Sequence, residues 1–441
     1  MPKLPTSRIA RTAKFGRMVG GAALKRNDPV AVADQLVTQL GQMKGAAMKI
    51  GQVLSTIDFD MVPEGEREQF KERLAALRDA APAVPFARLE KLLREELGGP
   101  LSGTFAEFSE EPVAAASIGQ VHRARTLDGR DVAVKVQYPG VAEAVETDLR
   151  NMAMLFPLVR RLAPALDVRA LGAELRERIS EELDYELEAQ HQRRVARVFR
   201  GHPHVRVPAV DTSLSSRRVL VTEFVEGSGF AVVKDLDEAE RDRFAEIVYR
   251  FFWGLLSHER LVAGDPHPGN YLLCPDGRVC FLDFGLMRQI DERYLDDERA
   301  LAQAVIAEDP EGVHRLLASL GYLPDPGSFE PQQVFDQIAE AGGWFFVAGF
   351  KRLDPEFVRL HMEATGSPRS RHFEHMRRQT LPPQALLLRR MEGLLFSVLG
   401  ELRAGADWGL LAREYIAAAA PSTALGLEDR AFWADRMPVS R

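Results

Sequence analysis

The stretch AGDPHPGNYLLCPDGRVCFLDFG, residues 263–285, decides the class of fold that this 441-residue chain adopts. Asp265 precedes Asn270 by five positions, and the triplet Asp283-Phe284-Gly285 begins thirteen positions after Asn270. Enzymes that transfer phosphoryl groups use a carboxylate to orient the attacking hydroxyl, followed by an amide and a carboxylate that hold Mg²⁺. Each piece alone is a weak signal. Their order and spacing predict Asp265 as the base or orienting carboxylate, Asn270 and Asp283 as metal ligands, and a short hairpin over 271–282.

A lysine that contacts nucleotide phosphates is predicted at Lys135, in the run DVAVKVQYP. Alternation with three valines places Lys135 on the opposite face of a strand. Such a lysine needs an acidic anchor; without one it is an ordinary exposed strand residue. The segment ISEELDYELEAQ is a predicted helix, in which Asp184 and Glu188 share a face because they are four positions apart. We assign Glu188 as the ion-pair partner of Lys135, against the alternative that these acids only form a solvated face.

The expected phosphate loop departs from the glycine-rich pattern G-x-G-x-x-G of protein kinases. Here the sequence is Ala114-Ala115-Ala116-Ser117-Ile118-Gly119, in which only Gly119 remains of the glycine set. Alanine disfavours positive φ angles and places a methyl group where backbone would otherwise approach phosphate closely. Backbone N–H groups of residues 114–117 can still bind phosphate, so we predict a nucleotide geometry unlike that of a protein kinase.

Other parts of the kinase pattern are altered or absent. Ala263-Gly264 stands where protein kinases have His-Arg before the catalytic aspartate, and no Ala-Pro-Glu triplet follows Asp283-Phe284-Gly285. His267 lies between two prolines, where it either contacts substrate or metal or makes a structural hydrogen bond. Glu223, Phe224 and Val225 end the last predicted strand of the small lobe. They are the expected hinge, whose backbone groups meet the adenine edge.

Period and turn signals predict an α+β chain with three parts: a basic tail and helical extension over 1–85, a small lobe over 86–225 and a helical large lobe over 226–441. The small lobe is expected to hold a five-stranded antiparallel sheet and a long helical region over 141–198. The predicted strands cover 103–109, 119–126, 131–138, 205–210 and 218–225. Helices are predicted over 30–58, 63–78 and 86–97, and the chain after 237 is expected to be mostly helical.

Composition restricts the function further. A net charge of −7 argues against nucleic acid as a partner. The two cysteines, Cys274 and Cys280, are expected to be buried free thiols of a reducing compartment. No transmembrane helix or secretory signal is predicted, which favours a cytoplasmic protein. Residues 1–26 carry seven basic side chains and no acidic one; they either lie peripherally on an anionic membrane surface or form a solvated tail.

One further motif, Lys49-Ile50-Gly51-Gln52, would by itself be interpreted as helix packing. Together with the alanine-rich loop that contains Ser117, with Lys135, with Glu182 and Asp184 in an E-x-D pattern, and with GDPHPGN and DFG, it gives residues 30–300 a specific resemblance to the UbiB/ADCK (AarF-type) atypical kinases. The resemblance implies a protein-kinase-like two-lobe fold whose N-terminal helical extension covers the active site. It also implies that Lys49 reaches into the site near Glu182 and Asp184, and that Lys49 and Gln52 obstruct protein substrates.

The resemblance implies ATPase activity and a role in ubiquinone or other isoprenoid-lipid metabolism at membranes. The leading hypothesis is therefore an Mg-ATP-dependent atypical kinase or ATPase, with ATP (or ADP) and Mg²⁺ as cofactors and a lipid-quinone precursor as a possible partner. The alternatives are a Ser/Thr protein kinase and a non-catalytic nucleotide-binding scaffold. The missing docking triplet argues against the first, and the full set of predicted metal ligands argues against the second. The oligomeric state does not follow from the sequence.

Overall fold

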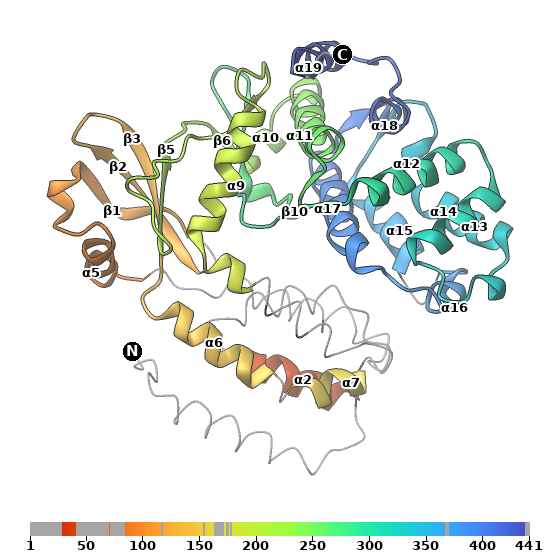
Figure 1. Cartoon of the computed structure of the whole chain (residues 1–441), viewed down its shortest axis with the longest axis horizontal. Helices are drawn as coiled ribbons and strands as arrows, with labels where there is room; N and C mark the ends of the chain where they lie inside the picture. Colours follow the sequence, from red (N-terminus) through yellow and green to blue (C-terminus); the bar gives the residue numbers. More distant parts are fainter. Residues whose placement is uncertain are drawn as a thin grey trace. The chain divides into compact units, whose positions relative to one another are not determined.

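The computed structural model describes residues 29–40, 70, 84–115, 118–152, 155–162, 172, 176, 179–366 and 370–436. The chain forms two compact units (Figure 1). Unit 1 contains Met1–Ala189 and Val210–Phe224, and unit 2 contains Gln190–Ala209 and Val225–Arg441. The chain therefore passes three times from one unit to the other, once at the predicted hinge between Phe224 and Val225.

Unit 1 contains an antiparallel sheet of strand order β1-β2-β3-β5. Its strands are β1 (Phe105–Ala115), β2 (Gly119–Thr126), β3 (Asp131–Gln137) and β5 (Val219–Glu223). The valines of β3 are at most 2% exposed and pack with Leu89 and Leu93 of helix α5 (Phe86–Glu96). The period-two pattern thus predicted both the strand and its buried face.

Strand β1 runs further than the sequence indicated. Ala114 and Ala115 pair with Val121 and Gln120, so this part of the predicted phosphate loop is strand. The register shifts on both sides of Pro112, because proline cannot donate a ladder hydrogen bond and is accommodated at bulges. Ala116 and Ser117 lie outside the described residues.

The expectation of a fifth small-lobe strand over 205–210 was wrong. Only Val210 reaches the unit 1 sheet, through an isolated bridge to Thr222. Val205–Arg206 forms β4, which pairs in parallel with β9 (Val279–Phe281) in unit 2. Pro208 interrupts the run between these two pairings, since it has no N–H to donate. The described sheet of unit 1 accordingly has four strands.

The helical region of unit 1 is segmented. Within the described residues it contains α6 (Val141–Met152), α7 (Phe156–Leu162) and the first turn of α9 (Tyr185–Val198), which continues into unit 2. The short helix η3 (Leu101–Gly103) precedes β1, and helix α2 (Pro29–Leu40) packs against α7. The remainder of the predicted helix 30–58 and all of 63–78 except Phe70 lie outside the described residues.

Unit 2 holds a sheet of order β4-β9-β8-β6, with β6 (Ser228–Gly229) and β8 (Tyr271–Leu273). Strands β8 and β9 are antiparallel, which confirms the predicted hairpin over 271–282. Two further pairs of short strands were not predicted: β7 (Leu261–Ala263) with β10 (Met287–Gln289), and β11 (Lys351–Arg352) with β12 (Gly405–Ala406). Strands of two or three residues are too short to show alternation.

The rest of unit 2 is helical, as predicted, around one large apolar core. Helix α11 (Glu238–Glu259) is buried on most sides, begins at the N-cap Asp237 and ends at Arg260 with φ of 55°. None of the helices in the described part of the chain is both long enough and apolar enough to span a membrane. The other helices are α10 (Phe230–Lys234), η4 (Pro268–Asn270), α12 (Glu292–Ile306), α13 (Pro310–Leu320), η5 (Pro326–Ser328), α14 (Pro331–Phe346), α15 (Pro355–Gly366), α16 (Phe373–Met376), α17 (Pro383–Glu401), α18 (Trp408–Ile416) and α19 (Ala424–Ala434).

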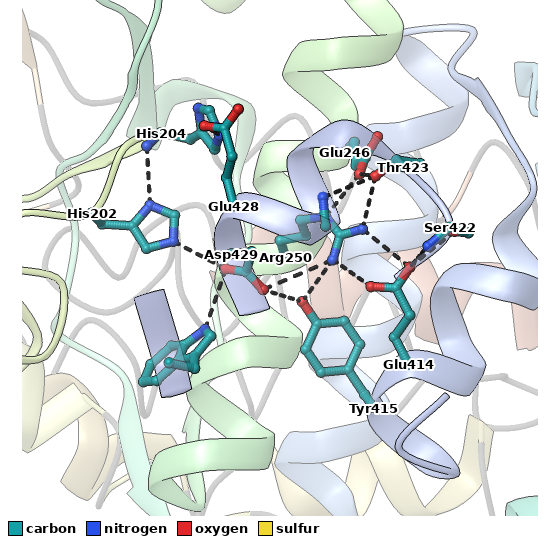
Figure 2. Close-up of polar contacts among 12 residues, drawn as sticks. His202, His204, Glu246, Arg250, Glu414, Tyr415, Ser422, Thr423, Glu428 and Asp429 are labelled. Carbon is teal, nitrogen blue, oxygen red and sulfur yellow. Dashed lines mark hydrogen bonds and ion pairs between the residues drawn. The ribbon is translucent and has the colours of Figure 1, made fainter. Parts of the chain in front are cut away.

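A buried polar network ties α18 and α19 to α11 (Figure 2). Arg250 of α11 is 3% exposed and contacts Glu246 at 2.8 Å, Glu414 at 2.7 Å and Asp429 at 3.8 Å. Asp429 also accepts from His202 at 3.0 Å. One guanidinium thus neutralises the charges of carboxylates from three helices, α11, α18 and α19. These ion pairs hold α18 and α19 on the core of unit 2.

Candidate active site

Unit 1 contains the predicted lysine–glutamate ion pair. Lys135 Nζ lies 2.6 Å from Glu188 Oε1 and 2.8 Å from Glu188 Oε2. The Glu188 side chain is 5% exposed and the Lys135 side chain 20%. The ammonium also lies 4.9 Å from the centre of the Tyr185 ring. The carboxylate and the ring hold the ammonium at one position, at which it remains partly accessible.

The first turn of α9, which carries Glu188, is fixed by its cap. Asp184 Oδ1 accepts from the backbone N–H groups of Glu186 and Leu187, both at 3.1 Å. A carboxylate there satisfies helix donors that have no partner within the helix. Asp184, which the family resemblance assigns to the E-x-D pattern, is therefore a structural cap. Glu182 lies just before this turn and is half-buried.

A buried glutamine connects β3 to the same turn. Gln137 is 2% exposed, and its amide donates to the carbonyl of Leu183 at 2.9 Å and to that of Arg217 at 3.2 Å. The backbone N–H of Tyr185 also donates to the Arg217 carbonyl, at 3.0 Å. The Gln137 side chain thereby ties the strand of Lys135 to the turn that precedes the helix of Glu188, and both segments bond to the Arg217 carbonyl.

The predicted hinge residues differ in their surroundings. Glu223 pairs with Val132 at the end of β5, and the N–H of Phe224 donates to the carbonyl of Asp131 at 3.0 Å. The Arg123 guanidinium lies 4.4 Å from the centre of the Phe224 ring. In unit 2, Val225 is 7% exposed and packs with the two cysteines.

The loop of Asp265 in unit 2 is held by its own backbone. The Asp265 carbonyl accepts from the N–H of His267 at 2.7 Å and from the Asn270 amide at 3.3 Å. The Asn270 carbonyl accepts from the N–H of Leu282 at 3.0 Å, which connects the loop to the residue before Asp283. This spacing brings Asp265, Asn270 and Asp283 into the lining of one recess, with the remaining lining supplied by Phe251, Phe252, Ala263, Tyr271, Phe281, Leu282 and Leu286.

The side chain of Asp283 is exposed, whereas that of the next residue, Phe284, is buried. Asp283 is exposed, and its Oδ1 accepts from the N–H of Gly285 at 2.9 Å. Phe284 is 1% exposed, and its carbonyl lies 3.0 Å from His191 Nδ1. The buried aromatic ring anchors the triplet, while the carboxylate stays accessible.

The oxygen donors at this recess fit a magnesium ion. Asp283 offers a carboxylate and Asn270 an amide oxygen, which are the hard ligands that Mg²⁺ accepts beside water and phosphate oxygens. Among the described residues, no group of three or more His, Cys, Asp or Glu side chains is arranged to hold a metal. A site with two protein ligands accordingly suits an ion that retains most of its contacts to water and nucleotide.

His267 has a structural role in the recess loop. Its Nδ1 accepts from the N–H of Gly269 at 3.1 Å and caps the short helix η4. That contact agrees with the structural alternative that the sequence left open. The predicted free thiols are also confirmed: Cys274 and Cys280 are both unbridged and buried.

Sequence reasoning missed one residue that contacts the predicted orienting carboxylate. Arg390 of α17 donates from Nη2 to Asp265 Oδ1 at 3.1 Å. It lies 125 positions beyond Asp265 in the chain. Its only signal in the sequence was a pair of arginines, Arg389 and Arg390, inside a largely apolar helix. Lys49 and Gln52 lie outside the described residues.

Comparisons with known proteins show which family the chain resembles. The model of the ABC1 atypical kinase-like domain matches residues 76–317. The chain is 30% identical over 363 residues to the mitochondrial atypical kinase COQ8B of Danio rerio, covering 77% of this chain and 57% of that protein. It is 32% identical over 288 residues to AarF domain-containing protein kinase 1 of Xenopus laevis, covering 63% of this chain and 54% of that protein.

A solved structure covers nearly the whole chain. The complex of Rv3197 with erythromycin from Mycobacterium tuberculosis aligns with a TM-score of 0.65 at 29% identity, over 93% of this chain and 98% of that one. The chain spans little more than half the length of the two curated relatives above. The match to more than half of its residues shows that the chain belongs to the ABC1 atypical kinase-like (UbiB/ADCK) family.

Proposed function

We propose that this protein is an Mg-ATP-dependent atypical kinase or ATPase that transfers the terminal phosphoryl group of ATP to water or to an acceptor. The observation that carries the proposal is the ion pair between Lys135 and Glu188, at 2.6 and 2.8 Å. An isolated strand lysine would extend into solvent, whereas this ammonium is held by a carboxylate that is 5% exposed. Such a lysine is suited to bind nucleotide phosphates.

Each predicted residue then has a defined role. Lys135 binds the phosphates, and Glu188 fixes the position of its ammonium. Asn270 and Asp283 hold Mg²⁺, which neutralises charge on the phosphate oxygens. Asp265 orients the attacking hydroxyl or water and accepts its proton, a function that typically contributes about 10²–10⁴-fold to the rate. Backbone groups at Ala114–Ser117 bind phosphate, and those at Glu223 and Val225 bind the adenine edge.

The acceptor is proposed to be a lipid-quinone precursor or water rather than a protein hydroxyl. The absent Ala-Pro-Glu triplet supports this choice, because protein kinases need that segment to dock their substrates. Control of access is proposed for Lys49, Gln52, Glu182 and Asp184, as the family resemblance implies. Contact with an anionic membrane through residues 1–26 is supported by their seven basic side chains.

The proposal is tested by Asp283→Asn in the full-length protein. The change removes one negative charge from the magnesium site while preserving shape, so Mg²⁺-dependent ATP hydrolysis is expected to fall by about 10²-fold or more. Asp276→Asn is the matched control, since Asp276 lies in the turn of the same hairpin and contacts Arg278. Unchanged hydrolysis by Asp283→Asn would reject the role of this carboxylate.

The acceptor is tested separately, by comparing hydrolysis with and without anionic liposomes and phenols that resemble quinone precursors. Stimulation by these additives supports the lipid assignment. Transfer of label from ATP to protein instead would favour the Ser/Thr protein kinase alternative.

A further inference from the structure

We propose that Arg390 is a positioning residue that holds the Asp265 carboxylate in its working orientation. This inference rests on the proposed function, in which Asp265 orients the attacking group. The guanidinium of Arg390 makes two contacts with the loop: Nη2 donates to Asp265 Oδ1 at 3.1 Å, and Nε donates to the Gly264 carbonyl at 3.1 Å. One rigid, planar group thus fixes both a carboxylate and the peptide that precedes it.

Burial makes this contact more than a surface ion pair. The Arg390 side chain is 15% exposed and the Asp265 side chain 22%. Exposed ion pairs contribute little because water screens them and both side chains lose entropy. A planar guanidinium with a second hydrogen bond to the adjacent backbone loses less freedom and restricts the carboxylate more strongly. The bond uses Oδ1, so the carboxylate retains its second oxygen as an acceptor for a hydroxyl.

The loop sequence explains how α17 comes close enough. A Cβ at position 264 would lie 2.2 Å from Leu387 Cδ1 and 3.0 Å from Leu286 Cδ2. Leu387 precedes Arg390 by three positions and so lies on the same side of α17. Gly264 therefore allows the close approach of this helix, which accounts for a glycine where protein kinases carry an arginine.

The neighbouring arginine anchors α17 on another side. Arg389 donates to Tyr322 Oη at 3.0 Å and to Glu392 at 2.7 Å, and it pairs with Glu298 of α12. Consecutive arginines point in different directions from a helix, so Arg389 holds α17 against α12 while Arg390 reaches the Asp265 loop. Helix α17 is thereby a support for the recess and not only a cover for the core.

The test uses Arg390→Lys, Arg390→Gln and Arg390→Ala in the full-length protein, with steady-state ATP hydrolysis as the readout. Arg390→Ala is expected to lower kcat by about 10- to 100-fold, because small misplacement of a reacting group has effects of this size. The KM for Mg-ATP is expected to stay within about threefold, since Arg390 contacts the orienting carboxylate and not the residues assigned to nucleotide. Added guanidinium ion at non-denaturing concentration should restore part of kcat in Arg390→Ala, and Arg390→Lys should be less impaired than Arg390→Gln.

A purely structural role gives a different result. Loss of folded protein would lower activity without specific rescue by guanidinium, and Arg389→Gln serves as the reference for that behaviour because Arg389 makes no contact with Asp265. A kcat within twofold of the unmodified protein in both Arg390→Gln and Arg390→Lys would overturn the inference, provided Asp265→Asn abolishes turnover. If Asp265→Asn itself retains full kcat, the proposed function of Asp265 fails and the inference falls with it.

Discussion

Gly119 and Tyr185 lie so close together that a Cβ on residue 119 would be 2.9 Å from the Tyr185 hydroxyl. The same Cβ would be 2.3 Å from the carbonyl oxygen of Val136. The centre of the Tyr185 ring in turn lies 4.9 Å from the ammonium nitrogen of Lys135. The last glycine of the phosphate-loop pattern is therefore needed for packing under the lysine, independently of any contact with phosphate.

Gly119→Ala is expected to destabilise unit 1 and weaken nucleotide binding. The added methyl group must displace a strand carbonyl or the tyrosine, which typically costs about 1–3 kcal/mol. Movement of Tyr185 would also shift the ammonium of Lys135. Thermal unfolding and nucleotide titration measure the two effects.

Gly103→Ala is the matched control for this change, since nothing lies within 4 Å of a Cβ there. Equal stability and nucleotide affinity in Gly119→Ala and Gly103→Ala would show that the close approach has no consequence.

Glu188→Gln is expected to reduce turnover more than it reduces stability. The amide keeps the shape of the side chain but removes the charge that holds the ammonium of Lys135. Because the lysine is 20% exposed, water compensates part of the lost pairing, and we expect a cost of about 1–2 kcal/mol in stability, below the 3–5 kcal/mol typical of a fully buried pair. Turnover of ATP should fall by about 10-fold or more, since the phosphate-binding group is no longer fixed.

Glu186→Gln, on the exposed side of the same helical turn, is the comparison for Glu188→Gln. If both variants hydrolyse ATP at the same rate, the assignment of Glu188 as the anchor is wrong.

The elements that the sequence predicted are those with local signals. Alternating valines identified β3 and the face of Lys135, and the four-residue spacing of Asp184 and Glu188 led to Glu188 as its partner. The Pro-Asp-Gly turn identified the hairpin between Asn270 and Asp283. Each of these depends on periods or turns within about ten residues, which is the range over which sequence patterns are informative.

The contacts that the sequence did not predict join segments that are far apart in the chain. Val205–Arg206 pairs with Val279 and Cys280, and Arg390 contacts a loop 125 positions earlier. A strand of two residues has no period, and one arginine on a helix does not indicate its partner. The bulged end of β1 at Pro112 was missed for a related reason, since alanines after a proline resemble a loop when the partner strand is unknown.

Arg250→Met is expected to destabilise unit 2 severely. The Arg250 guanidinium is 3% exposed, and its positive charge neutralises the negative charges of Glu246, Glu414 and Asp429. Burial by itself would lower the pKa of the Arg250 guanidinium, but Tyr415, Glu414 and Glu246 together raise it above its ordinary value. Removal of the cation leaves buried charges without compensation, which costs about 3–5 kcal/mol.

Arg377→Met provides the contrast, because Arg377 and Glu374 form a pair whose side chains are 55% and 83% exposed. Exposed pairs of this kind contribute at most about 1 kcal/mol. Thermal unfolding should separate the two variants clearly, and similar midpoints would contradict the proposed role of the network.

The stability of unit 1 should depend on pH through His122. The ring is fully buried, with Nδ1 2.8 Å from the Ser109 carbonyl and Nε2 2.9 Å from the Gln120 amide nitrogen. A carbonyl only accepts, so Nδ1 carries the proton and Nε2 accepts from the amide. Burial lowers the pKa of His122 below its ordinary value of 6.5, and the bond to Ser109 offsets only part of this effect.

Because the folded-state pKa is lowered, the unfolded chain takes up a proton first as the pH falls below about 6.5. The contribution of His122 to the free energy of unfolding is therefore complete above that pH and is lost as the pH falls toward the folded-state pKa. The total loss is about 1.4 kcal/mol for each unit by which the pKa of His122 is lower in the folded state than in the unfolded chain. Denaturant unfolding at pH 7.5 and pH 5.5 measures the difference. His122→Gln removes the buried ring, so the variant should be less stable than the unmodified protein at pH 7.5. Because glutamine keeps a donor for Ser109 and cannot be protonated, the variant should lose less stability when the pH falls to 5.5. An equal loss of stability in both proteins would show that the pH dependence does not come from His122.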